Sequence, residues 1–206
     1  MSDDENENEN QNEIKAILLG NAGVGKTNLI NRAIGLKFDE NYNSTSSGIF
    51  RTKKIEIGNK SYTVNLWDTA GQEIYKSITK IFVKRSKIVI FVYDITDKKS
   101  FEDLEGWIKM CKDLLDNDYI CGIAGNKMDL YSIEQVTENE ARKFAENQKM
   151  KFQLVSAKEN PESFDTFLKE LIDGNPLFKS ETNISNSNNF ELKKNNVKPK
   201  KKRKFC

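Results

Sequence analysis

Residues 20–29 read GNAGVGKTNL, and this stretch decides the fold because glycines, a lysine and a threonine directly follow the apolar run AILL. The spacing of Gly20, Gly25, Lys26 and Thr27 fits the pattern G-x-x-x-x-G-K-[ST], which connects a strand to a helix. The sequence NLINRAI continues the stretch as a plausible helix. The stretch therefore predicts a loop that binds the phosphates of a nucleotide.

The residue types of this phosphate loop, residues 20–27, suit that task. Glycine permits positive φ and lets bare N–H groups approach a polyanion, and the helix start adds unpaired N–H groups and a positive dipole end. Lys26 supplies a mobile positive charge for the β- and γ-phosphates, and the Thr27 hydroxyl is a suitable magnesium ligand. The alternative interpretation is a glycine-rich turn with a surface lysine.

Length and composition limit the class of protein. At 206 residues the chain suits one globular domain with tails. No apolar run reaches about 18 residues, so we expect no transmembrane helix, and the acidic start MSDDENENENQNE is the opposite of a signal peptide. Acidic residues dominate 1–13 and basic residues dominate 175–206, so the net charge of +2 conceals a nearly neutral body. These features favour a cytosolic protein.

Cysteine and histidine usage restricts the chemistry. Cys111, Cys121 and Cys206 lack the spacing of a metal site or a disulfide framework, and the first two are expected in the core. The chain contains no histidine, which removes the commonest general base and metal ligand. Any reaction must therefore use carboxylates, amides, backbone groups and metal.

Apolar runs alternate with helix-like stretches along the chain. We expect a folded domain over 14–174 between two disordered ends, 1–13 and 175–206. The alternation favours an α/β fold with a mostly parallel sheet. The expected strands are 15–20, 62–67, 87–94, 119–125 and 151–156, and the expected helices include 100–115, 137–147 and 161–172.

One pair of strands departs from the alternation. Residues 48–57 and 60–67 are joined across Gly58 and Asn59, which predicts a tight hairpin and one antiparallel edge strand. The expected helix caps are Ser100, Thr137 and Asn160.

Further candidate site residues follow three of the expected strands. WDTAGQE follows YTVNLW, NKMDL follows YICGIAG, and SAK follows KFQLV. In open α/β sheets, ligands bind at the carboxyl ends of the strands, so these segments and the phosphate loop should meet. Together they resemble the four nucleotide motifs of the Ras-like small GTPases, and WDTAGQE and YDITDKKSF resemble the Rab family in particular, over about residues 14–174.

This resemblance implies a fold and an activity. The fold is a P-loop GTPase domain with a six-stranded, mostly parallel sheet, one antiparallel edge strand and helices on both faces. The activity is a switch that binds GTP, hydrolyses it to GDP and phosphate with Mg²⁺, and recruits effectors in vesicle trafficking. The other implied partners are an exchange factor, an activating protein and a GDP-dissociation inhibitor.

The catalytic assignments concern Lys26, Gly71 and Gln72. Gly71 has no side chain to keep its N–H from the γ-phosphate, and the Gln72 amide both donates and accepts, as orienting an attacking water requires. The motifs hold no evident arginine finger, so intrinsic turnover should be slow and an activating protein should accelerate it. The resemblance places the following residues of these motifs at the nucleotide: Gly20, Ala22, Gly23, Val24, Gly25, Lys26, Thr27, Asn28 and Gly71.

Guanine recognition is assigned to NKMDL and SAK. Asp129 has two acceptor oxygens for the two N–H donors on one edge of guanine, whereas adenine offers a different pattern. By resemblance, Asn126 braces the loop and contacts the base, and the backbone N–H of Ala157 reaches the guanine carbonyl. The Lys127 stem and Lys158 then cover the base faces, and Ser156 belongs to the same site.

The polar segment between Lys37 and Phe50 resembles the first switch segment. The resemblance places Phe38 against guanine and makes Thr45 a magnesium ligand when the γ-phosphate is present. With Asp68, which can hold the ion through water, the implied metal residues are Thr27, Thr45 and Asp68.

Two departures from the Rab pattern affect the partner surfaces. Ser46, Ser47 and Gly48 stand where apolar and acidic residues surround a glycine in Rab proteins. Ile74 stands where the family usually has arginine. Nucleotide binding is still expected, with a changed partner set.

The chain ends in KPKKKRKFC, a basic cluster followed by one cysteine. Rab carboxyl-terminal cysteines carry geranylgeranyl groups, so the resemblance implies prenylation of Cys206 and membrane binding through lipid and basic tail. A single final cysteine fits neither the usual pair nor C-a-a-X. Two alternatives remain: PKKKRK as a nuclear import signal, and a solvated tail with a free thiol.

We expect a monomer on the cytoplasmic face of intracellular membranes, with a cytosolic pool and no nucleic-acid partner. One rival function is a nucleotide-bound scaffold that does not hydrolyse GTP. A second rival is a Ras-like GTPase with a nuclear-targeted tail. An ATPase is a third, which Asp129 opposes.

Overall fold

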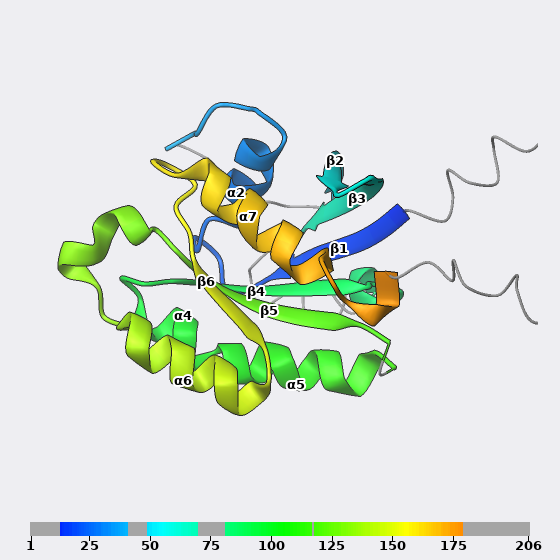
Figure 1. Cartoon of the computed structure of the whole chain (residues 1–206). Helices are drawn as coiled ribbons and strands as arrows, with labels where there is room; N and C mark the ends of the chain where they lie inside the picture. Colours follow the sequence, from blue (N-terminus) through cyan, green and yellow to red (C-terminus); the bar gives the residue numbers. More distant parts are fainter. Residues whose placement is uncertain (1–12, 41–48, 70–80, 117, 179–206) are drawn as a thin grey trace, which may run out of the picture.

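The computed structural model describes residues 13–40, 49–69, 81–116 and 118–178, in which strands and helices alternate (Figure 1). The strands are β1 (Glu13–Leu19), β2 (Ile49–Ile57), β3 (Lys60–Asp68), β4 (Ile88–Asp94), β5 (Ile120–Asn126) and β6 (Lys151–Leu154). The helices are α2 (Lys26–Ala33), α4 (Lys98–Glu102), α5 (Leu104–Leu114), α6 (Glu138–Gln148) and α7 (Pro161–Ile172), with short 3₁₀ turns η2 (Met128–Ile133) and η3 (Pro176–Phe178).

The strands form one six-stranded sheet in the order β2-β3-β1-β4-β5-β6. β2 and β3 pair antiparallel through a turn in which Gly58 has φ +57°, and the other four pairings are parallel. This confirms the expected sheet, including its antiparallel edge strand. All seven residues of central β4, IVIFVYD, are buried, as expected for a parallel strand covered on both faces.

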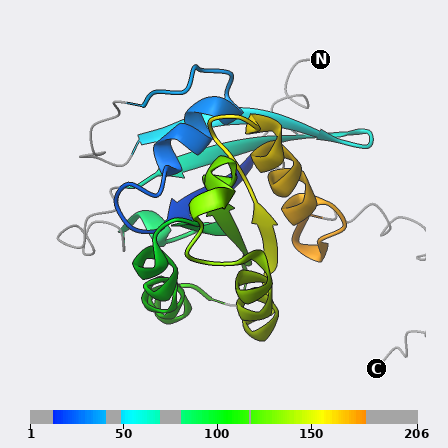
Figure 2. The same ribbon diagram turned by 90° about the vertical axis from the view of Figure 1, so that its left-hand side faces the viewer.

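Helices cover both faces of the sheet (Figures 1 and 2). Successive residues of β1 point to opposite faces of the sheet. Leu18 belongs to the cluster that α2 and α7 cover, and Leu19 belongs to the cluster that α5 and α6 cover. Phe167 is a fully buried member of the first cluster and Trp107 is a buried member of the second. The expectation of helices on both faces is therefore confirmed.

The helix starts agree with expectation at two of three caps. Thr137 and Asn160 accept hydrogen bonds from the N–H groups of Glu140 and Ser163, as N-caps do. Ser100 is wrong as a cap, because α4 begins earlier and Asp97 caps it by accepting from the N–H groups of Lys99 and Ser100.

Ser100 lies fully buried inside α4 and serves a different purpose. Its hydroxyl donates to the Asp97 carbonyl and accepts from the Asp94 N–H at the end of β4. The expected helix over 100–115 is in fact two helices, because α4 ends at Glu102 and α5 starts at Leu104.

Packing continues beyond the expected boundary at 174. Phe178 packs against the first cluster, the centroid of its ring lies 6.4 Å from that of Tyr62, and its carbonyl accepts from the Tyr62 hydroxyl at 3.1 Å.

Of the two free cysteines in the described ranges, Cys111 is buried, as expected, whereas Cys121 is only partly buried. Burial raises the pKa of both thiols to about 12. Within the described ranges, no helix has the length and apolar character needed to span a membrane.

Candidate functional site

A cavity of about 510 Å³ lies at the carboxyl ends of the strands, where the loops after β1, β5 and β6 meet. This volume is typical of a small-ligand site. Its lining residues are Ala22, Gly23, Gly25, Lys26, Thr27, Asn28, Phe38, Asp39, Glu40, Thr69, Asn126, Lys127, Asp129, Leu130, Ala157 and Lys158. The tertiary structure thus brings the phosphate loop together with the segments NKMDL and SAK.

Two glycines let the phosphate loop approach its neighbours closely. Gly20 has φ +151°, and a Cβ there would lie 2.0 Å from the carbonyl oxygen of Val92 in β4. Gly25 has φ +95°, and a Cβ there would lie 2.3 Å from Nδ2 of Asn126. A side chain at either position would collide with its neighbour in a backbone conformation that already disfavours L residues.

Lys26 at the start of α2 is a buried cation. Its Nζ donates to the carbonyl oxygens of Gly20 and Asn21, at 2.8 Å each. Burial lowers the pKa of the Lys26 ammonium to about 8, against the opposing influence of nearby Asp68. A cation held by two loop carbonyls on the cavity wall is well placed to meet an anion.

Thr27 and Asp68 bring two oxygen ligands together. The Thr27 hydroxyl donates to Oδ2 of Asp68, which is buried at the end of β3, at 2.7 Å. Thr69 follows and anchors this strand end by donating to the Leu18 carbonyl at 2.7 Å. In the described ranges, no three His, Cys, Asp or Glu side chains gather as a metal cage. A hydroxyl and one carboxylate nonetheless suit Mg²⁺, which takes its remaining oxygen ligands from phosphates and water.

Asn126 connects three loops at the end of β5. Its Nδ2 donates to the Val24 carbonyl at 2.8 Å, and its Oδ1 accepts from the Ala157 N–H at 3.3 Å. Asp129 is linked to the same loops because the Ser156 hydroxyl donates to its Oδ1 at 2.5 Å. These bonds fix NKMDL and SAK relative to the phosphate loop.

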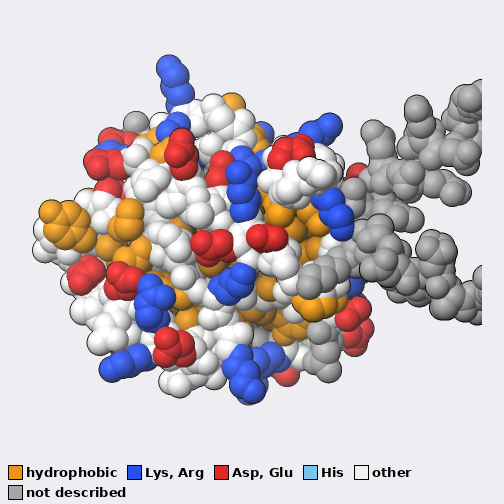
Figure 3. All heavy atoms as spheres, in the orientation of Figure 1, with side chains coloured by type: hydrophobic (Ala, Val, Ile, Leu, Met, Phe, Trp, Pro, Cys, Tyr) orange, Lys and Arg blue, Asp and Glu red, His pale blue; other side chains and the backbone are white. Residues whose placement is uncertain are grey.

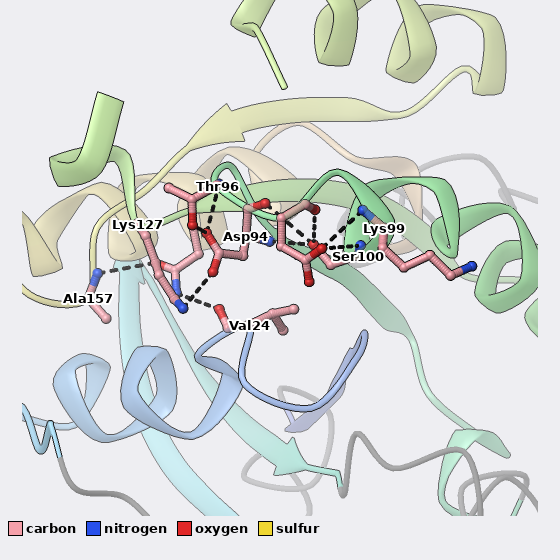
Figure 4. Close-up of polar contacts among 9 residues, drawn as sticks. Val24, Asp94, Thr96, Lys99, Ser100, Lys127 and Ala157 are labelled. Atoms are coloured by element: carbon pink, nitrogen blue, oxygen red, sulfur yellow. Dashed lines mark hydrogen bonds and ion pairs between the residues drawn. The ribbon is translucent and has the colours of Figure 1, made fainter. Parts of the chain in front are cut away.

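Lys127 forms an ion pair that we did not predict from the sequence (Figure 4). Its Nζ lies 2.5 Å from Oδ2 of Asp94, whose side chain is only 9% exposed. Both the N–H and the hydroxyl of Thr96 donate to the other oxygen of Asp94, at 2.9 and 2.7 Å. Asp94 therefore fixes the Lys127 ammonium from the neighbouring strand.

The outer wall of the cavity comes from the chain after α2. Asn28 holds this segment by donating to the Asp39 carbonyl and accepting from its N–H, at 2.9 and 3.2 Å. Phe38 lines the cavity, and Glu40 pairs with Lys158 at 2.7 Å. The hydrogen bond and charge of Glu40 raise the pKa of Lys158. This ion pair connects the first switch segment to SAK.

Not every expected site residue lines the cavity. Four described residues are not part of its lining but contact residues that are: the carbonyls of Gly20 and Val24 accept from Lys26 and Asn126, Asp68 accepts from Thr27, and the Ser156 hydroxyl donates to Asp129. Several expectations lie outside the described residues, namely those for Thr45, Ser46, Ser47, Gly48, Gly71, Gln72, Ile74 and Cys206.

Sequence reasoning missed six residues at or beside the site. Their positions are Asn21, Asp39, Glu40, Asp94, Thr69 and Leu130. The strand-end rule could have found Asp94, which ends β4 at the edge where Asp68 ends β3. The other five lie within segments that we singled out from the sequence, but we predicted no role of their own for them.

Comparison with known proteins agrees with this geometry. The model of the Ras family matches residues 15–173. Human Rab-21 is 39% identical to this chain over 154 residues, which cover 75% of this chain and 68% of that protein. The chain belongs to the Rab family of Ras-like small GTPases.

Other relatives of this Rab-family GTPase have similar identity. Human Rab-12 is 36% identical over 179 residues, covering 85% of this chain and 73% of that protein. Rab-11C of Dictyostelium discoideum is 36% identical over 159 residues, covering 77% of this chain and 71% of that protein. Family membership confirms the resemblance to Rab proteins and the fold that the sequence motifs implied.

Proposed function

We propose that this Rab-like small GTPase binds GTP in the cavity, hydrolyses it to GDP, and recruits effectors to a membrane in the GTP state. The observation that carries the proposal is the convergence of buried Lys26, the Thr27–Asp68 pair and the Asn126–Asp129 segment on one cavity. Neither an ATPase nor a scaffold that does not hydrolyse GTP is favoured by the family membership.

The cavity offers one place for phosphates and another for the base. We assign the phosphates to the N–H groups of the phosphate loop and to Lys26, because a helix start and an ammonium both attract anions. Asp129 receives guanine, since a carboxylate has about four lone-pair positions and can keep the Ser156 hydroxyl while accepting two N–H groups. Phe38, Lys127 and Lys158 line the walls between which the base would lie.

Thr27 and Asp68 are our candidates for holding Mg²⁺, with Thr45 as an expected third residue in the GTP state. The ion would neutralise charge on the β- and γ-phosphates. Thr69 supports this assignment because its hydrogen bond to Leu18 fixes the strand end that carries Asp68.

Hydrolysis requires a water molecule aligned with the γ-phosphate. We assign its orientation to Gln72, and charge stabilisation to Lys26 and the Gly71 N–H. Because the nucleotide motifs hold no evident arginine finger, the protein should turn over on the order of 10⁻⁴ per second and depend on an activating protein.

We assign membrane binding to the tail, and effector recruitment to an aromatic surface of Phe50, Trp67 and Phe82. Prenylated Cys206 and the basic cluster would provide two anchoring signals, and a GDP-dissociation inhibitor would extract the lipid. Lys, Arg, Asp and Glu side chains are interspersed on the face shown in Figure 3, whereas in the sequence acidic residues dominate 1–13 and basic residues dominate 175–206. Half-exposed Phe50 stacks on Trp67 with ring centroids 5.1 Å apart, and Phe82 lies 5.4 Å beyond. We assign effector docking to this surface, and we expect the G domain itself to be monomeric.

The deciding experiment is single-turnover hydrolysis of magnesium GTP by the purified chain, with bound nucleotide measured at the start and the end. We expect slow conversion of GTP to GDP and no conversion of ATP. An Asp129→Asn variant provides the control for the base site, because it should weaken GTP binding and favour xanthine nucleotides. Stable bound GTP would support the scaffold, and equal turnover of ATP would contradict the guanine assignment.

A further inference from the structure

Asn21 is the residue of the phosphate loop whose side chain turns toward α5 rather than lining the cavity. Its Nδ2 donates to Oδ2 of Asp103 at 2.8 Å. Its Oδ1 accepts from Nε1 of Trp107 at 3.1 Å. One amide thus uses both its donor and its acceptor on the start of a single helix.

The backbone of the same residue holds the catalytic cation. The Asn21 carbonyl accepts from Nζ of Lys26 at 2.8 Å, beside the Gly20 carbonyl at the same distance. The side chain and carbonyl of Asn21 therefore form a continuous connection from α5 to the Lys26 ammonium. A rotation of the Asn21 peptide would move one of the two oxygens that hold this ammonium.

We propose that Asn21 is a positioning residue that ties the phosphate loop to α5, orients Lys26 and thereby slows nucleotide release. This inference rests on the proposed function, because it assigns to Lys26 the binding of phosphate. It adds a support on α5 that the nucleotide motifs themselves do not contain.

The chemistry of the two partners explains why an amide suits this position. Asp103 is an acceptor whose other oxygen pairs with Lys99 at 2.5 Å, whereas the indole N–H of Trp107 is a donor on a side chain that is 4% exposed. An amide satisfies both partners at once. A carboxylate at position 21 would still accept from Trp107 but would face the Asp103 carboxylate with like charge.

This complementarity allows a test by exchange of partners. Asn21→Asp removes the donor, and a second change, Asp103→Asn, restores it from the opposite side. The single Asn21→Asp variant should release GDP about tenfold faster than the wild type, because a charge-assisted hydrogen bond is replaced by repulsion. The double variant should return to within about threefold of the wild-type rate. The matched control is Glu105→Gln, which neutralises an exposed carboxylate on the same helix.

The measurement is the dissociation rate of a fluorescent GDP from full-length protein loaded with magnesium and nucleotide. A wild-type rate in Asn21→Asp, or a fast rate that Asp103→Asn leaves uncorrected, would overturn the proposal. A role in packing alone predicts additive losses in the double variant, so the rescue separates positioning from general stability.

A gentler variant covers the case in which Asn21→Asp fails to fold. Trp107→Phe removes the indole N–H and retains most of the ring, so it should accelerate GDP release by a few-fold. An unchanged rate would contradict the positioning role of Asn21. If wild-type protein fails to retain GDP at all, the proposed function fails instead. These two failures are therefore distinguishable in one series of measurements.

Discussion

Single residues determine how closely the loops of this site approach one another. Gly25 has no Cβ, and Asn126 fills that space with an amide that reaches the Val24 carbonyl. Lys26 lies buried beside them and donates hydrogen bonds to two carbonyl oxygens. We therefore expect nucleotide affinity to depend on the absence of a Cβ at Gly25 and on the charge of the Lys26 ammonium.

We expect Gly25→Ala to weaken GDP binding by more than tenfold, because the new Cβ would lie 2.3 Å from Asn126 Nδ2. Gly58→Ala is the control. Gly58 also has positive φ, at +57°, but nothing lies within 4 Å of its would-be Cβ, so it bears only the backbone strain. Equilibrium titration of GDP measures both variants, and equal affinities would contradict the packing argument.

We expect Lys26 to make GDP binding dependent on pH. Its pKa of about 8 without nucleotide should rise when phosphates surround the ammonium. Below about pH 7 the side chain is protonated in both states, so binding takes up no proton at Lys26. Toward about pH 9, binding must protonate it, and affinity should fall by up to tenfold per pH unit.

Calorimetry of GDP binding in buffers with different ionisation enthalpies measures this proton uptake directly. We expect uptake approaching one proton toward about pH 9 and little near about pH 7. Uptake that grew as the pH fell would contradict the assignment to Lys26.

At the scale of elements, the ends of neighbouring parallel strands hold the site together. β4 ends at Asp94 and β5 ends at Asn126, and these two residues lie opposite each other in the sheet. Lys127 follows with φ +66°, which directs the chain back toward the Asp94 carboxylate. The sheet register thus fixes an ion pair between residues that no local pattern connects.

Asp94→Asn should lower the free energy of unfolding by about 2 kcal/mol, since it leaves Lys127 without its partner. The estimate is reduced from that of a fully buried pair because Lys127 is 34% exposed. Asp118→Asn is the matched change in an exposed pair with Lys87, where the two atoms are 3.6 Å apart, and it should cost less than about 0.5 kcal/mol. Urea unfolding at fixed GDP concentration compares them, and equal losses would show that burial of Asp94 is unimportant.

At the scale of the whole molecule, the end of the described chain closes the core. Phe178 packs against Tyr62 of β3, the strand beside the edge strand β2, although the two residues are far apart in sequence. In the sequence, the acidic segment 1–13 and the basic segment 175–206 flank a nearly neutral stretch. A domain that ended at the expected boundary, residue 174, would lack this contact.

Two truncations test where the stable domain ends. A chain ending at residue 178 should match the full chain, whereas a chain ending at 174 should lose about 2 kcal/mol, through the partly buried Phe178 ring and its carbonyl. Thermal unfolding of the GDP-loaded proteins measures the difference. Identical midpoints would place the boundary at 174 after all.

The sequence by itself determined the fold class, the family and the main cavity residues. Periodic apolar runs predict strands and helices locally, and the spacing of the phosphate loop is a local property of the backbone. The α7 boundaries, the Gly58 turn and the caps Thr137 and Asn160 were predictable for the same reason.

Only the tertiary structure decided which side chains support those residues. Asn21 with Asp103, Asp94 with Lys127, and Tyr62 with Phe178 each join segments whose separation depends on sheet order and helix packing. The buried Ser100 hydroxyl likewise accepts from the Asp94 N–H at the end of β4, and Asp97 rather than Ser100 caps α4. Local pattern fixes what a backbone segment can form, whereas a side-chain contact depends on the distance that the whole fold imposes.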